Sequence, residues 1–166
     1  MIDVERMQKQ EFIDYLTTKR ILEQIFSAYD AEVCMVKQAD YSHTDARLTV
    51  TKNGKSKQYT VEIKTRNVDN PEYLETMPLK VSKYCDIMDV TYSHETPLLI
   101  YLINDEDYYI FNLKKLDWNN VKCFNWCINK VEYTANKKTA KTPVFMLPIS
   151  EAIYNGLIPK KNANNQ

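Results

Sequence analysis

The spacing of apolar residues predicts a long helix at the start of the chain. From residue 4 to residue 29, apolar side chains recur at helical spacing, as in the pair Phe12 and Leu16. This pattern is typical of one amphipathic helix. It also fits two helices that meet near Thr17 and Thr18, with Thr18 as the cap of the second.

Runs rich in β-branched residues predict strands after this helix. We expect strands at 32–36, 47–51 and 58–65, and the Asn53-Gly54 pair between the last two is the strongest hairpin signal in the chain. Residues 71–78 are typical of a loop, and 79–90 have helical spacing. Residues 98–103 are too apolar for a surface strand, so we expect a central strand that is buried on both faces.

The last third of the chain predicts mostly strands. We expect strands at 108–113, 127–134 and 143–147, and a short helix at 150–157 that ends at Gly156. The order of elements predicts a single α/β domain over residues 1–166, in which a mixed β-sheet is flanked by helices.

Composition limits the class of protein. The 166 residues are 44% hydrophobic and 27% charged, which suffices for one core. The longest apolar run, residues 97–103, is too short for a bilayer span, and the first residues lack a signal-peptide core. We therefore expect a cytoplasmic protein without a membrane partner. Its four cysteines are then expected to be reduced, buried thiols, because their spacing matches no common zinc module.

Charge is distributed unevenly, although the formal net charge is zero. Residues 1–112 hold 13 Lys/Arg and 19 Asp/Glu, a net of −6, whereas residues 113–166 hold 9 and 3, a net of +6. A basic extension that includes Lys137, Lys138 and Lys141 would suit contact with phosphates. A solvated lysine-rich face is the alternative.

Three polar residues of the predicted hairpin carry the functional hypothesis. Residues two apart in a strand share a face, so Glu62 and Lys64 project together with Arg66, and Asp45 opens the partner strand. Two converging carboxylates repel each other unless a cation lies between them, and oxygen ligands favour Mg²⁺ or Mn²⁺. A lysine beside such an ion stabilises charge that develops on a phosphate.

The order of these residues and elements resembles the PD-(D/E)XK nuclease superfamily, which includes restriction endonucleases and archaeal-type Holliday junction resolvases. The resemblance covers about residues 18–113, and residues 114–166 would be a basic carboxy-terminal β extension. Asp45 matches the aspartate of the motif, Glu62 its second acid and Lys64 its lysine. Thr44 stands where the name-giving proline would be.

The resemblance implies a restriction endonuclease-like core and a metal-dependent endonuclease acting on DNA, with branched or otherwise structured DNA among the candidate substrates. Asp45 and Glu62 would bind Mg²⁺ or Mn²⁺ and Lys64 would position the attacking water. The family often adds an acid from the first helix, for which Glu23 fits the distance to the first strand better than Glu11. Arg66 and Lys83 would join the lysines of the extension in binding DNA. A homodimer is left open.

The sequence also fits two alternatives to an active nuclease. Glu62, Lys64 and Arg66 could form the solvated face of an edge strand, with Asp45 a turn residue. The fold could also be a catalytically inactive scaffold that binds DNA or a protein, because a fold does not determine a function.

Overall fold

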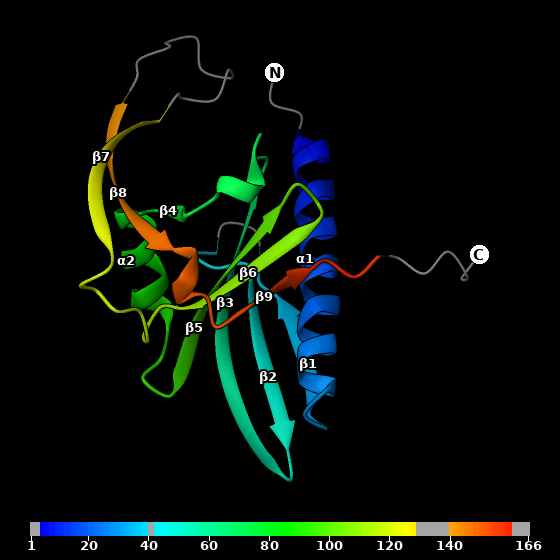
Figure 1. Ribbon diagram of the computed structural model, residues 1–166. Coiled ribbons are helices and arrows are strands. Elements are labelled where there is room, and N and C mark those ends of the chain that lie inside the picture. Colours follow the sequence, from blue (N-terminus) through cyan, green and yellow to red (C-terminus); the bar gives the residue numbers. More distant parts are fainter. Residues whose placement is uncertain (1–3, 40–41, 129–139, 161–166) are drawn as a thin grey trace.

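A six-stranded sheet separates two layers in this computed structural model, which describes residues 4–39, 42–128 and 140–160 (Figure 1). In spatial order, its strands are β1 (Glu32–Lys37), β2 (Ala46–Lys52), β3 (Lys55–Arg66), β5 (Glu95–Ile103), β6 (Asp107–Asn112) and β9 (Tyr154–Leu157). Helix α1 (Val4–Ser27) packs on one face. The other face carries α2 (Val81–Val90) and a three-stranded sheet of β4 (Thr76–Lys80), β8 (Ala140–Pro148) and β7 (Lys122–Ile128). The predicted α/β class, a mixed sheet flanked by helices, is confirmed.

The predicted hairpin is present between β2 and β3. Asn53 and Gly54 have φ values of 52° and 72°, the left-handed backbone that a two-residue hairpin turn needs at both central positions. The two strands pair antiparallel from Lys52 opposite Lys55 to Ala46 opposite Val61. This register brings the start of β2 beside the second half of β3.

Strand β5 is central and almost fully buried, as its sequence predicts. It pairs parallel with β3 and antiparallel with β6. Its side chains alternate between two cores: Leu98, Ile100 and Leu102 pack on the α1 side, and Leu99, Tyr101 and Ile103 pack on the other side. A strand with two buried faces explains the continuous apolar run.

Helix α1 is a single helix, so the interpretation with two helices is wrong. Thr18 lies inside the helix and is completely buried against the sheet. Ile21 and Leu22 follow it at 1% exposure each, and burial of one such side chain stabilises the fold by about 1.5–3 kcal/mol. Packing on the sheet therefore keeps the helix continuous through its two threonines.

The prediction of a loop over residues 71–78 is only partly right. A 3-10 turn, Pro71–Tyr73, is followed by β4, which takes up Thr76 to Lys80, so α2 begins at Val81 and not at residue 79. Pro78 lies in β4 because this strand forms an edge of the small sheet, where a missing backbone N–H is tolerated.

Strands β7 and β8 confirm the predicted pair but not its bounds. Strand β7 begins at Lys122 rather than at residue 127, and β8 extends from Ala140 to Pro148. Pro143 pairs only with β7 and Pro148 only with β4, so each proline lies where β8 has a single neighbour. Residues 129–139, which include Lys137 and Lys138, lie outside the described part of the chain.

The predicted helix over residues 150–157 is wrong. A short 3-10 turn, Ile149–Glu151, leads into β9, which pairs with β6 and forms the edge of the six-stranded sheet. The backbone groups of β9 therefore form ladder hydrogen bonds with β6 and not helical ones. Gly156 does not end a helix but makes room for a ring, because a Cβ atom at this position would lie 3.0 Å from the Tyr108 hydroxyl oxygen.

The described cysteines are exposed, and none of the described helices is suited to a membrane. The thiols of Cys34, Cys85 and Cys123 are free but exposed, so the expectation of buried thiols is wrong for these three, which lie on the outer sides of β1, α2 and β7. Within the described residues, no helix combines the length and apolar character needed to cross a membrane.

A buried ion pair joins the starts of the central strands. The Glu95 carboxylate is 4% exposed and is paired with Arg47, whose guanidinium also donates to Val90 O and lies 5.0 Å from the centre of the Tyr92 ring. Glu95 also accepts hydrogen bonds from the Thr60 hydroxyl and the Tyr92 N–H, both at 3.0 Å. Burial raises the pKa of Glu95, but these three donors outweigh it and hold the pKa below its usual value.

We expect Glu95→Gln to lower the free energy of unfolding by about 2 kcal/mol at neutral pH, less than for a fully buried pair because Arg47 is partly exposed. A lowered carboxyl pKa stabilises the fold above the pKa of the unfolded chain, and this contribution is lost as pH falls through the native pKa. Urea unfolding of both proteins from pH 7 down to about pH 3 measures the difference. Glu72→Gln, an exposed carboxyl, is the control. A difference that does not depend on pH would contradict the assignment.

Candidate functional site

Asp45 is positioned immediately before β2 by its backbone and its side chain. Its N–H donates to Val61 O at 3.0 Å, and its carbonyl accepts from Gln38 N at 2.8 Å, so β1 and β3 hold it from both sides. The carboxylate accepts the N–H of Ile63 at 2.6 Å. Because a strand's backbone N–H points along the plane of the sheet, the Asp45 carboxylate lies beside β3 near that plane.

Glu62 is a buried carboxylate in the middle of β3. It is 1% exposed, on the face that carries α2, and its neighbours in the strand point to the α1 core. Its Oε1 atom forms ion pairs with Lys64 at 2.5 Å and with Lys83 of α2 at 3.0 Å. Its Oε2 atom is buried and has no hydrogen-bond partner among the described residues. The alternative of a solvated edge strand is therefore wrong for Glu62, since β3 is an internal strand.

Electrostatics make Glu62 an unusual acid. Burial raises its pKa, the Lys64 ammonium opposes this rise, and the negative charge of Asp45 raises the pKa further. The net shift is upward even with two lysines in contact. Glu62 and Lys64 are thus in direct contact, and Asp45 is close enough for its charge to act on Glu62.

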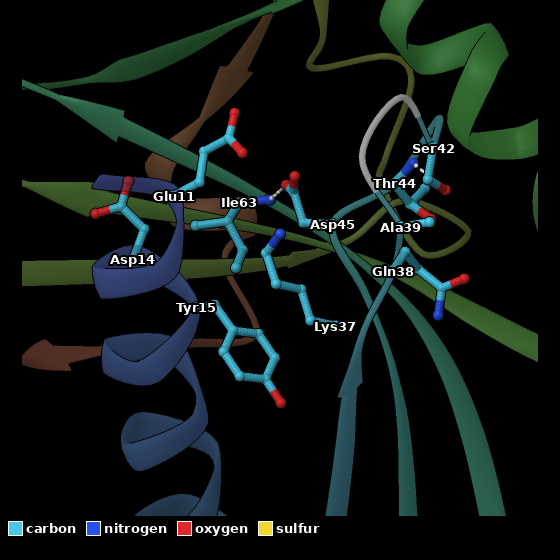
Figure 2. Close-up of a pocket in the computed structure, with 10 residues that line it drawn as sticks. All are labelled: Glu11, Asp14, Tyr15, Lys37, Gln38, Ala39, Ser42, Thr44, Asp45 and Ile63. Carbon is cyan, nitrogen blue, oxygen red and sulfur yellow. Dashed lines mark hydrogen bonds between the residues drawn. The ribbon is translucent and has the colours of Figure 1, made fainter. Parts of the chain in front are cut away.

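A cavity of about 140 Å³ lies beside Asp45 on the α1 side. Figure 2 shows Glu11 and Asp14 on α1, at the opposite side of the cavity from Asp45. Asp14 is already engaged, since it accepts hydrogen bonds from the Thr65 hydroxyl at 2.7 Å and from Gln10 at 2.8 Å. Glu11 is exposed and has no hydrogen bond or ion pair among the described residues, so its carboxylate is available to a ligand.

The helix acid chosen from the sequence, Glu23, does not lie at this cavity. Its side chain is 47% exposed and pairs with Lys19 one turn earlier, at 3.8 Å. Twelve residues separate Glu23 from Glu11, which is about 18 Å along a helix axis and about a third of a turn around it. The distance along the chain to the first strand favoured Glu23, but α1 runs past the site, so the acid at the cavity comes from its first half (Figure 1).

The residues predicted to bind DNA fall into three groups. Lys83 lies within the site, where it pairs with Glu62 and donates to His43 O at 2.8 Å. Arg66, at the end of β3, is exposed and donates to Thr65 O. Lys141 is exposed on β8, and Lys137 and Lys138 lie outside the described residues.

The sequence analysis missed Lys37, which lines the cavity from β1. The alternation of β1 was the only signal for this residue.

Hard oxygen donors are present, but they do not form a ready metal site. Within the described residues, no group of three or more His, Cys, Asp or Glu side chains is placed to hold an ion. The available donors are Glu11, Asp45 and the unpartnered oxygen of Glu62. Oxygen donors suit Mg²⁺ or Mn²⁺, but Glu62 points to the α2 face and does not line the cavity that Glu11 and Asp45 border.

Comparisons with protein-family models, with curated proteins and with solved structures returned no match.

Because the pKa of Glu62 is raised, its ionisation destabilises the fold. We expect wild type to be most stable relative to Glu62→Gln below the pKa of the unfolded chain, and to lose this advantage as pH rises through the native pKa. Urea unfolding of both proteins between about pH 4 and pH 8 measures the change. Glu32→Gln, at an exposed position of β1, controls for the loss of a surface carboxyl. An advantage of wild type that grows with pH would show that the lysines outweigh burial.

Proposed function

We propose that this protein is a metal-dependent endonuclease that hydrolyses phosphodiester bonds in DNA. The observation that carries the proposal is the buried Glu62 carboxylate, which contacts Lys64, lies within range of the Asp45 charge and keeps one oxygen unpartnered. Ionisable groups with a perturbed pKa cluster at functional sites. The two acids and the lysine also occur in the order and on the strands of the PD-(D/E)XK motif that the sequence resembles.

The chain's own residues have distinct parts in this proposal. Asp45, Glu62 and Glu11 would hold Mg²⁺ or Mn²⁺, which would supply Lewis-acid activation of water and phosphate. Lys64 stabilises negative charge on the phosphate, and its ammonium opposes the rise that burial causes in the pKa of Glu62. The hydrogen bond from Ile63 N fixes the Asp45 carboxylate, so part of the site is rigid before any ligand binds.

A second candidate is an inactive scaffold that binds DNA or a protein. One observation favours it: Glu62 is held between Lys64 and Lys83, an arrangement in which two ammonium groups already take the place of a cation. In that case, the cluster stabilises the contact between β3 and α2, and no metal is needed.

Cleavage of a panel of branched, single-stranded and duplex DNAs with Mg²⁺ or Mn²⁺ separates the two candidates. We expect wild type to cleave at least one of them and Lys64→Ala to lower single-turnover cleavage by about a hundredfold, the usual effect of one preorganised charged group. Lys55→Ala, an exposed lysine of the same strand, should retain activity. Thermal melting of each variant shows whether it is folded.

The carboxylates are tested through metal affinity. Mn²⁺ titration should show weaker binding for Asp45→Asn and Glu11→Gln, whereas Glu23→Gln, an acid of the same helix away from the cavity, should bind as wild type does. A wild type that binds no Mn²⁺ and cleaves no substrate would favour the scaffold. Equal loss in Glu11→Gln and Glu23→Gln would contradict the placement of the site.

The basic extension is tested by the salt dependence of DNA binding. We expect replacement of Lys137, Lys138 and Lys141 by glutamine to weaken binding and to lower the slope of log K against log salt by about 0.9 for each phosphate that the variant no longer neutralises. Fluorescence anisotropy at several salt concentrations gives this slope. The control is the double variant Lys52→Gln/Lys55→Gln at the tip of the hairpin. An unchanged slope in the extension variant would place the DNA elsewhere.

A further inference from the structure

A second, larger cavity lies on the α1 face, away from the acids of the candidate site. It has a volume of about 410 Å³, within the range of small-molecule sites. Its floor is formed by the first half of β3, the start of β5 and the end of β6, where the sheet pairs Tyr59 with Thr96 and Leu98 with Asn112. The second half of α1 and the start of β9 form its walls. The cavity shares no lining residue with the one beside Asp45.

The inner part of this cavity is apolar. Leu98 and Ile110 form its base, and they are themselves 2% and 1% exposed. Phe26 on one side and Ile153 on the other add apolar walls, and the Tyr59 ring lies 6.2 Å from the Phe26 ring. An apolar ligand body would displace water from these surfaces.

The charged side chains described at this cavity are cations. Lys57 and Lys115 line it, and neither has an ion-pair partner among the described residues. None of the described lining residues is an Asp or Glu, although acids are as frequent as bases in the whole chain. Asn112 is 8% exposed, and its Oδ1 is occupied by Lys114 N at 3.1 Å, so its amide NH₂ is the group left to donate to a ligand.

We propose that this cavity binds a small molecule with an apolar body and one anionic head group, a carboxylate or a phosphate monoester. The body lies on Leu98 and Ile110, and the head group lies between Lys57 and Lys115. This binding is independent of the proposed nuclease activity, because the two sites lie at different ends of β3.

The test is calorimetric titration of the full chain with decanoate, decyl phosphate and decanol, each below its micelle-forming concentration. We expect one or both anions to bind with one molecule per chain, and decanol to bind at least about tenfold more weakly, because two partly exposed ion pairs together supply about that factor. Tighter binding of decanoate identifies a carboxylate ligand, and tighter binding of decyl phosphate identifies a phosphate monoester.

Substitutions of residues that line the cavity test whether the anions bind there. Lys57→Gln/Lys115→Gln should weaken anion binding about tenfold, and the matched double variant Lys52→Gln/Lys55→Gln should change it by less than about twofold. Ile153→Trp, at a position that is 42% exposed and therefore tolerant, should fill the cavity and weaken binding of both anions. The proposal is wrong if neither anion binds, if decanol binds as tightly as the anions, or if the cavity variants retain wild-type affinity.

Discussion

Burial of the Glu62 carboxylate is the constraint around which this site is organised. An ionised carboxylate without water needs nearby positive charge, and the fold supplies it from the same strand through Lys64 and from α2 through Lys83. The ion pair between Glu62 and Lys83 also links α2 to the sheet. Even so, one carboxylate oxygen remains without a partner, and the pKa of Glu62 remains raised. The compensation of the buried charge is therefore incomplete.

Asp45 is the second acid of the candidate site, and it lies beside β3 at the point where β2 begins. Strand β2 begins after Asp45 while β3 continues, so the Ile63 N–H would lack a ladder partner without the Asp45 carboxylate. The same carboxylate lines the cavity that Glu11 borders, and its charge acts on Glu62. A backbone requirement thus places Asp45 at the cavity that Glu11 borders and within range of the Glu62 charge.

The sequence predicted the fold best where local signals and packing agree. The Asn53-Gly54 turn, the continuous apolar strand β5 and the amphipathic α1 are each specified by local residues. The errors arose where distant pairing decides the structure. Residues 154–157 form β9 because β6 offers an open edge, and residues 76–80 form β4 because β8 lies alongside. Neither partner is visible in the local pattern.

The candidate site was predictable to a similar extent. Strand periodicity and hairpin register place Glu62, Lys64 and Asp45 near one another, since all three lie within one hairpin. The choice between Glu11 and Glu23 depends on how α1 lies across the sheet, which distance along the chain does not specify. The ion pair between Lys83 and Glu62 likewise depends on the packing of α2.

Strand β5 also determines how the protein unfolds. Its odd and even residues belong to two different cores, one under α1 and one under α2 and the three-stranded sheet. Neither core is complete without this strand, so the two cannot melt as separate units once β5 is released. Local openings can detach α1 or the small sheet, but loss of β5 is a single cooperative event in which both halves of the protein lose their structure together.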